Sequence, residues 1–302
     1  MSENVNTSLI KRKKISFVPY WFILPAVILL IVLMLYPIIT VIYYSFMDKV
    51  ITVKESHFVG FKNYKTILAD PVFWISVKNT LVYTIISVFF HMIIGLAFAL
   101  LLNTDLIPSF LKGLLRVCFI MPWVLTVTIV AILWRLILNP DGILNYILSN
   151  MGLMSTKIAW LSEVKTAMPS LIFINIWSGY PYFMVTILAA LQGIPKDYYE
   201  AATIDGCNGF EKFIYITLPQ LKPVMLSIIM LDLIWTMRVF ALVWSTTGGG
   251  PITATEVLGS YIYKKAYNIL DFSTASAASV IILLMSIVLS IFYVKAQKVR
   301  ED

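Results

Sequence analysis

Six long, nearly uncharged apolar runs dominate the chain, and shorter polar segments separate them. A helix that crosses a membrane needs about 20 consecutive apolar residues, and each run is long enough. We predict six spanning helices, over Tyr20–Met47, Asn79–Leu102, Leu114–Leu138, Ala167–Gln192, Pro223–Trp244 and Ser273–Val294. The apolar residues are continuous rather than alternating, which argues against barrel strands. The pattern therefore predicts an all-α membrane protein.

Composition supports this class. Of the 302 residues, 60% are hydrophobic and 13% are charged, whereas a soluble domain is about a quarter charged. The net charge of +7 fits basic residues beside membrane helices, so we expect a lipid bilayer and no nucleic acid as a partner. Cys118 and Cys207 are too few for a disulfide framework, and the first run is too long for a cleaved signal peptide.

Basic residues near the ends of the runs indicate the orientation. Residues 11–14 are all basic and precede the first run, while Lys112 and Arg116 lie in the short second-to-third connection. Cytoplasmic loops carry an excess of such residues, and an even number of spans puts both termini on one side. We therefore predict three parts: a cytoplasmic tail over 1–19, a six-helix transmembrane domain over 20–297 and a second cytoplasmic tail over 298–302.

Three connections then lie on the outer side. The first contains FVGFKNYKTIL (58–68), whose apolar residues share one helical face, and this predicts a short amphipathic helix that ends at Asp70-Pro71. The second, Asn139–Thr166, begins with turn residues. The third contains TTGGGP, Thr246–Pro251, which cannot continue a helix.

The cytoplasmic segment 195–219 has strong local signals. Pro195 is suited to the start of a helix, and Gly206 is suited to the left-handed position at its end. Asn208 followed by Glu211 is the pattern of a capping box for a second helix. Leu218-Pro219 is expected to end that helix before the fifth span. The pattern predicts two helices joined by a tight glycine turn.

The surface of the first of these helices has two interpretations. One face holds Tyr198, Ala201, Ala202 and Asp205, so two small residues would let another surface approach closely. It could dock into a partner, or it could lie on the lipid surface as an ordinary amphipathic helix. Membrane-surface helices are usually rich in Lys and Arg, whereas this helix has three acids, Asp197, Glu200 and Asp205, against Lys196. The charges favour docking.

These residues resemble the EAA motif of bacterial ABC importer permeases. The positions that match it at the expected spacing are Glu200, Ala201, Ala202, Asp205, Gly206, Leu218 and Pro219. Cys207 replaces a residue that is commonly Ala. Phe58–Thr84, Leu188–Gly206 and TTGGGP resemble the carbohydrate-uptake branch, in particular its MalF-like half, so the resemblance covers nearly the whole chain.

The resemblance implies an ABC importer type I permease fold in the bacterial cell membrane, with 195–219 as a cytoplasmic coupling helix. The implied partners are a second, MalG-like permease subunit, two copies of an ABC ATPase and an external or periplasmic solute-binding protein. The chain itself is expected to be non-catalytic and to bind no cofactor. It has no Gly-x-x-x-x-Gly-Lys-Ser/Thr loop to hold phosphates, so ATP and Mg would be bound by the ATPase.

The implied substrate is a sugar, namely an oligosaccharide. Alternatives are a non-sugar solute such as glycerol phosphate, or a secondary transporter. Secondary transporters usually show internal repeats with acids in matching halves, but the chain has no evident repeat and one clear mid-membrane acid, Asp232. An intramembrane enzyme would need a catalytic group, and no Ser/His pair or metal-ligand spacing is evident for His57 or His91.

Candidate substrate-path residues cluster in two spans. They are Asn175, Trp177, Tyr180, Tyr182, Asp232, Trp235 and Arg238. Charges inside a membrane usually face a cavity or a partner, and Gly179 and Pro181 predict a local break in the fourth span. Alternatively, Asp232 and Arg238 pair with the sister permease and the aromatic residues belong to the interface belt. We expect His91 to be a packed or hydrogen-bonded core residue, and Arg135 to extend to the membrane surface.

Overall fold

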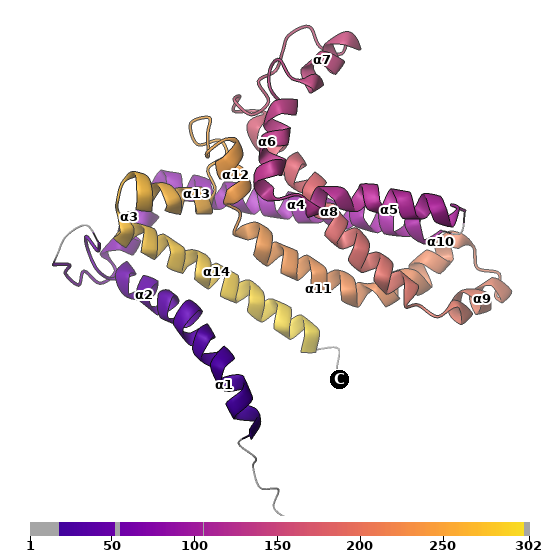
Figure 1. Ribbon diagram of the computed structural model, residues 1–302, viewed down its shortest axis with the longest axis horizontal. Helices are drawn as coiled ribbons and strands as arrows, with labels where there is room; N and C mark the ends of the chain where they lie inside the picture. Colours follow the sequence, from indigo (N-terminus) through magenta and orange to yellow (C-terminus); the bar gives the residue numbers. More distant parts are fainter. Residues whose placement is uncertain (1–17, 52–54, 105, 299–302) are drawn as a thin grey trace, which may run out of the picture.

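The computed structural model describes residues 18–51, 55–104 and 106–298, which are almost entirely helical (Figure 1). The basic residues 11–14 and most of both predicted tails lie outside these ranges. The elements, with η marking π-helical turns, are α1 (Val18–Leu30), η1 (Ile31–Leu35), α2 (Tyr36–Ser45), α3 (Lys62–Leu68), α4 (Pro71–Asn103), α5 (Ser109–Val124), α6 (Val127–Ile137), α7 (Ile143–Asn150), α8 (Ala167–Gln192), α9 (Lys196–Ile204), α10 (Gly209–Lys212), η2 (Phe213–Thr217), α11 (Leu218–Met237), α12 (Ala241–Thr246), α13 (Leu258–Tyr263), η3 (Lys264–Asn268) and α14 (Phe272–Lys298).

Five helical stretches are long and apolar enough to cross a membrane, and the bent pair α5 and α6 brings the number to six if it counts as one span. This agrees with the six predicted spans. The bounds of α8 are those expected from the apolar pattern. The predicted amphipathic helix is α3, and its Ile67 is fully buried beside Phe73 and Tyr261, whereas Leu68 and the preceding Phe61 are exposed.

The third span is not the single helix that the sequence predicts. It is divided into α5 and α6, which meet at 99°. Leu125 and Thr126 are extended where the helices separate. Pro122 lies in the last turn of α5, where the missing N–H already removes one helical hydrogen bond. Continuous apolar character predicts burial in the membrane but says nothing of this bend.

The fifth span also differs from the prediction at both ends. Leu218-Pro219 does not end the second helix of the 195–219 segment, since α10, η2 and α11 form one continuous stretch, Gly209–Met237. Pro219 falls in the first turn of α11, and the π-helical turn η2 precedes it. At the other end the helix stops at Met237 instead of Trp244, and Arg238 lies in the connection to α12.

The predicted break in the fourth span is wrong as well. Helix α8 is continuous through Gly179 and Pro181. Gly179 serves a different purpose, because a Cβ atom at this position would lie 2.3 Å from Nε2 of His91. Gly95 likewise allows α4 to approach α8, since its Cβ atom would lie 2.4 Å from Cβ of Phe183. Two glycines therefore permit close packing of α4 and α8.

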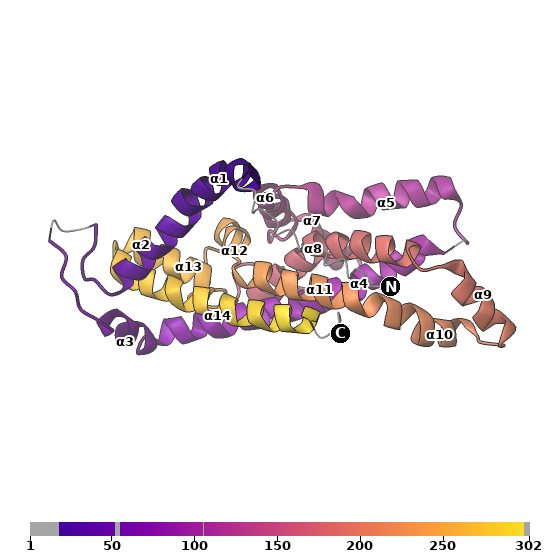
Figure 2. The ribbon, with the colours of Figure 1, turned by 90° about the horizontal axis from the view of Figure 1, so that it is seen from below.

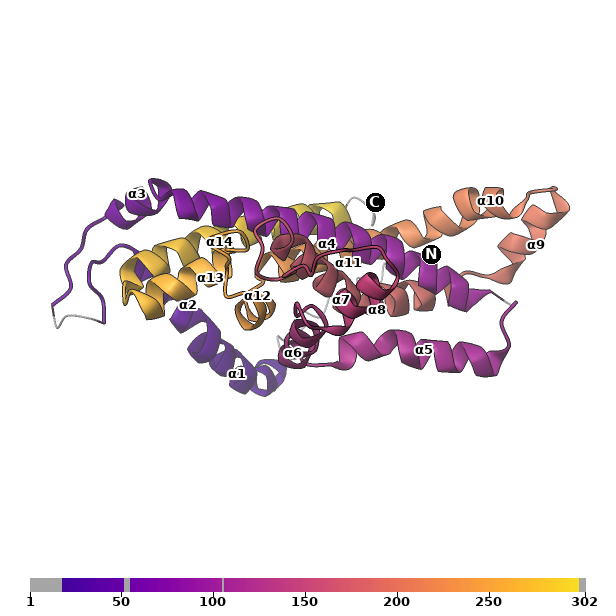
Figure 3. The same cartoon turned by 90° about the horizontal axis from the view of Figure 1, so that it is seen from above.

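The helices α4, α8, α11 and α14 run along the long axis of the molecule (Figures 1 and 2). At one end α9 and α10 project beyond the bundle, while α3 and α13 lie at the opposite end (Figure 3). The main core lies between α4, α8 and α11, where Phe183, Met184 and Leu221 are fully buried. Helix α1 stands apart, and every side chain from Trp21 to Ile39 is exposed.

Candidate functional site

Gly206 forms the turn between α9 and α10, as the sequence predicts. Its φ angle is +81°, in the left-handed region that favours glycine. The turn closes by backbone hydrogen bonds from Asp205 N to Ala201 O (3.0 Å), from Gly206 N to Thr203 O (3.1 Å) and from Cys207 N to Ala202 O (2.9 Å). The last carbonyl groups of α9 are thereby satisfied.

The predicted capping box is present at the start of α10. Asn208 N donates to Glu211 Oε2 at 2.7 Å, and Glu211 N donates to Asn208 Oδ1 at 3.0 Å. Two further side-chain contacts tie α9 to the stretch that follows the turn. Lys212 Nζ donates to Thr203 Oγ1 at 2.7 Å, and the hydroxyl groups of Tyr199 and Thr217 lie 3.0 Å apart. The α9–α10 segment (195–219) is therefore a defined unit.

The motif residues face two directions. Glu200, Ala201, Asp205, Gly206 and Pro219 are exposed, Leu218 is half-buried and Ala202 is buried. The two alanines therefore do not form one exposed patch, contrary to the sequence interpretation. Ala202 packs inward, while Ala201 stays on the outside.

Apolar side chains add to the exposed surface of the α9–α10 segment. Ile204 is 87% exposed and Phe210 is 73% exposed, on either side of the glycine turn. Sequence reasoning missed the exposure of both residues. Exposed apolar residues that project beyond a bundle typically mark an interaction site.

Asp232 lies in the core and pairs within its own chain. Its Oδ2 atom is 2.7 Å from His91 Nδ1, and its Oδ1 atom accepts a hydrogen bond from Thr236 at 3.0 Å. His91 Nε2 lies 3.0 Å from the carbonyl oxygen of Asn175. His91 is therefore the hydrogen-bonded core residue that the sequence predicts, and it links α4, α8 and α11.

The two ring nitrogens of His91 bond to different partners. A carbonyl oxygen can only accept, so Nε2 carries a hydrogen. Nδ1 and the carboxyl group of Asp232 share a second hydrogen bond. Such a pair suits a membrane interior, where an isolated charge is costly. Sequence reasoning missed this pairing because the two residues are 141 positions apart.

An aromatic face lies beside this pair. We define it as Trp123, Tyr182 and Trp235, from α5, α8 and α11. The ring centroids of Tyr182 are 5.7 Å from Trp235 and 6.1 Å from Trp123. Trp235 and Trp123 are 53% and 52% exposed. The sequence prediction included two of these residues and missed Trp123, although its position after Pro122 was a possible signal of a break.

The other predicted path residues are distributed differently. Arg238 is exposed at the end of α11, and its Nε donates to Ile234 O at 3.4 Å. Tyr180 is buried and its hydroxyl donates to Phe119 O at 3.2 Å. Trp177 packs edge-on against Trp134 of α6. The structure thus brings Tyr182, Trp235 and Arg238 to an accessible surface and leaves Asp232 and Tyr180 inside.

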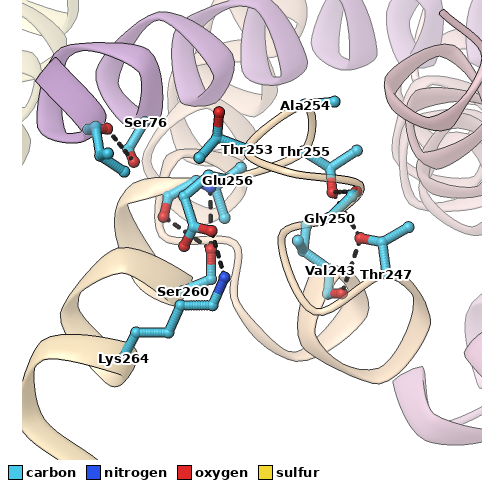
Figure 4. A network of polar contacts seen from close by, with 12 residues as sticks. Ser76, Val243, Thr247, Gly250, Thr253, Ala254, Thr255, Glu256, Ser260 and Lys264 are labelled. Atoms are coloured by element: carbon cyan, nitrogen blue, oxygen red, sulfur yellow. Dashed lines mark hydrogen bonds and ion pairs between the residues drawn. The ribbon is translucent and has the colours of Figure 1, made fainter. Parts of the chain in front are cut away.

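A polar network holds the loop between α12 and α13 (Figure 4). The carboxylate of Glu256 is 2% exposed and forms an ion pair with Lys264. Asn79 of α4 donates to carbonyl oxygens of the loop, including that of Glu256 at 3.0 Å. Gly249, with φ +89°, lies against the Glu256 carboxylate and leaves no room for a Cβ atom. These contacts tie the loop that contains TTGGGP to α4 and η3.

Asp70 joins α4 to α13 and η3 at the same end of the molecule. Its side chain accepts hydrogen bonds from Val72 N (2.9 Å) and from the Tyr261 hydroxyl (2.8 Å), and it pairs with Lys265 (3.0 Å). Partial burial raises the pKa of the Asp70 carboxyl, but these three contacts outweigh burial and hold that pKa below its usual range.

Over residues 18–51, 55–104 and 106–298, no three His, Cys, Asp or Glu side chains gather at a spacing that could hold a metal ion. The arrangement offers two kinds of surface instead. One is a projecting segment with small, acidic and apolar groups, and the other is an aromatic face among membrane helices.

Known proteins resemble the chain over nearly its full length. The family model described as "binding-protein-dependent transport system inner membrane component" matches residues 93–300. The chain is 35% identical, over 99% of its length, to the trehalose/maltose transport system permease protein MalF of Thermococcus litoralis, which is covered completely. It is 33% identical, over 98% of its length, to the lactose transport system permease protein LacF of Rhizobium radiobacter, of which 99% is covered.

The fold also matches a solved structure. One chain of a bacterial ABC transporter involved in the import of the acidic polysaccharide alginate superposes with a TM-score of 0.83 and 23% identity. The match covers 95% of this chain and 96% of that one.

Proposed function

The chain belongs to the family of binding-protein-dependent transport system inner membrane components, and we propose that it carries sugars, in particular oligosaccharides, through an ATP-driven importer. It is a membrane-embedded, multi-pass permease subunit of a binding-protein-dependent ABC importer. Permease subunits of such importers are non-catalytic. In our proposal a separate subunit therefore binds ATP and Mg and performs the hydrolysis.

The observation that carries the proposal is the α9–α10 segment. It projects from the end of the bundle, is shaped by Gly206 and the Asn208–Glu211 capping box, and exposes Glu200, Ala201 and Asp205. We assign it as the coupling segment that docks on a cytoplasmic ATPase subunit. The exposed side chains of Ile204 and Phe210 supply apolar contact area for docking.

The aromatic face supports a sugar as the substrate. Sugar rings present apolar C–H faces, which can pack on the exposed rings of Trp123 and Trp235, while polar groups orient their hydroxyls. Arg238 is exposed near Trp235 and could supply such a group. Two relatives are named for the transport of trehalose/maltose and of lactose, which are sugars. Asp232 is placed to hold three helices together through His91 rather than to contact substrate.

The complete transporter would contain this chain, a MalG-like sister permease, two ATPase copies and an external solute-binding protein. ATP binding would close the ATPase dimer and move both docked coupling segments, which would switch the permease pair from inward-facing to outward-facing. Hydrolysis would reset it. Such a switch requires two conformations of the permease pair, inward-facing and outward-facing. Binding at either end of the molecule must shift the equilibrium between them. The side chains of α1 are exposed from Trp21 onward, so the sister permease or lipid could pack against them.

The test is ATP hydrolysis by the complex reconstituted from these four components, with a panel of saccharides and glycerol phosphate. Stimulation by one class of oligosaccharide is the expected result, and it would identify the substrate. A complex that assembles and hydrolyses ATP but responds to no sugar would contradict the carbohydrate proposal. A response to glycerol phosphate alone would favour the non-sugar alternative.

A further inference from the structure

A polar cavity lies at the ends of α6 and α12, in a region that the proposed function has not used. Its volume is about 320 Å³, near the lower end of the range of roughly 300–1,000 Å³ typical of ligand pockets. Three segments line it: the end of α6, the 139–162 loop and the 246–251 turn. The lining side chains with polar ends are Arg135, Asn139, Ser162, Thr246 and Thr247.

Arg135 gives this cavity its charge. The residue is exposed in the last turn of α6, and its guanidinium makes no hydrogen bond or ion pair with the part of the chain that the structure describes. The nearby acids are engaged elsewhere, because Asp141 pairs with Lys157 and Glu163 accepts the N–H of Ala159 at 3.0 Å. The lining contains no acidic side chain. A guanidinium in such surroundings suits a carboxylate, which it can bind with two parallel hydrogen bonds.

The loop wall of the cavity is ordered by one buried residue. Asn145 is 1% exposed, and its Nδ2 donates to the carbonyl oxygens of Pro140 (3.0 Å) and Ile158 (2.8 Å). Its Oδ1 accepts from the indole N–H of Trp160 at 3.1 Å. These contacts tie both ends of the loop together around α7.

The opposite wall is ordered independently. The hydroxyl groups of Thr247 and Thr255 lie 2.7 Å apart, and Thr255 also donates to the carbonyl oxygen of Gly250. Because both walls are set by the chain's own hydrogen bonds, the cavity is formed before any partner arrives. Preorganisation of this kind lowers the entropic cost of binding.

We propose that this cavity receives a carboxylate side chain of the external solute-binding protein, with Arg135 as its principal contact. The inference rests on the proposed function and on the orientation predicted from the sequence, in which the 139–162 and 246–251 segments lie on the outer side. The cavity shares no lining residue with the aromatic face. A group bound in the cavity is therefore at a different site from a sugar bound on that face. A neutral oligosaccharide would also bring no carboxylate. The partner that approaches this side and can supply an acid is the binding protein.

The test measures how much solute-binding protein, loaded with a neutral sugar, gives half-maximal stimulation of ATP hydrolysis by the reconstituted complex. For Arg135→Gln we expect this concentration to rise about tenfold, as for the loss of one charge-assisted hydrogen bond. Arg135→Glu should raise this concentration further. Added salt should then lower the half-maximal concentration, whereas it should raise that of the unaltered complex. Lys62→Gln, which removes an exposed cation on α3 outside the cavity lining, is the matched control and should have little effect.

Each outcome decides between the proposals. If binding protein stimulates the unaltered complex and the Arg135 variants respond at the same concentration, the carboxylate site is wrong and the proposed function stands. If only an acidic sugar reveals a defect in the variants, the anion comes from the substrate, and the binding-protein assignment is overturned. An unaltered complex that no solute-binding protein stimulates overturns the proposed function together with this inference.

Discussion

Gly206 is the single residue on which the shape of the α9–α10 segment depends most. Its φ angle of +81° costs an L-residue about 1–2 kcal/mol, whereas no atom lies close enough to obstruct a side chain. We predict that Gly206→Asp leaves membrane insertion intact but lowers sugar uptake about tenfold or more, because the turn no longer holds the docking surface. Uptake into proteoliposomes measures the effect.

Gly209→Asp is the matched control for this substitution. Gly209 is equally unobstructed but starts α10 without a left-handed φ angle, and an acid in the first turn of a helix is favourable. Uptake that stays normal in Gly206→Asp, or that falls equally in both variants, would contradict the role of the turn.

His91 and Asp232 give a prediction about stability. Removal of one partner of a buried pair leaves the other unpaired, at a cost of about 3–5 kcal/mol in soluble proteins. We expect His91→Leu and Asp232→Leu each to lower the thermal unfolding temperature of the detergent-solubilised complex strongly. The double variant should unfold at a higher temperature than either single variant. If the double variant instead loses the sum of what the two single variants lose, the two residues act separately.

Trp235 gives a prediction about substrate. Trp235→Ala should weaken sugar uptake at low sugar concentration about tenfold, because a stacking surface is lost, while ATP hydrolysis without binding protein stays unchanged. Trp21→Ala, which removes an even more exposed tryptophan from α1, should leave uptake intact. Unchanged uptake and specificity in Trp235→Ala and Trp123→Ala would remove the aromatic face from the path.

Among the elements, the start of α4 depends on one carboxylate. Asp70 caps this helix and binds Tyr261 and Lys265, and its pKa is held below the usual range. A depressed pKa stabilises the folded state above the unfolded pKa of about 3.9, and this contribution is lost as the pH falls through the folded value. The unfolding temperature should therefore fall more steeply below about pH 4 than in Asp70→Asn. Parallel pH profiles for both proteins would contradict this account.

The sequence predicted the helices well and their breaks poorly. Apolar run length is a strong signal, and local rules located Gly206, Asn208 and Glu211 correctly, because a cap depends only on neighbours in the chain. The bend after Pro122, the end of α11 at Met237 and the passage through Pro219 depend on packing between distant helices. Proline occurs both at breaks and inside continuous membrane helices. Its presence in the sequence therefore could not distinguish a broken helix from a continuous one.

In the candidate site too, local sequence patterns predicted some features, while others depend on packing between distant residues. Asp205 was placed on an exposed face by helical spacing, whereas the burial of Ala202, which was placed on the same face, depends on tertiary packing. The pairing of His91 with Asp232 joins two spans that no periodicity connects. Trp123 reaches the aromatic face because α5 ends beside α8, which only the fold reveals.

At the scale of the whole molecule, different regions have different proposed tasks. In the proposed function, the α9–α10 segment would dock on an ATPase, the aromatic face would contact sugar, and the loops on the predicted outer side would meet a binding protein. The helices α4, α8 and α11, joined through His91 and Asp232, connect these regions as one packed body. Motion of the docked segment can therefore be transmitted along the bundle rather than absorbed at its end.

The central claim is that the α9–α10 segment docks on a cytoplasmic ATPase, and the most direct test is photo-crosslinking in the assembled complex. A photo-reactive residue at Ile204, which is 87% exposed at the turn, should crosslink to the ATPase subunit. The same residue at Tyr146 of α7, which is 67% exposed on the predicted outer side, should not. An ATPase crosslink from Tyr146, or none from Ile204 in a complex that still hydrolyses ATP, would contradict the account.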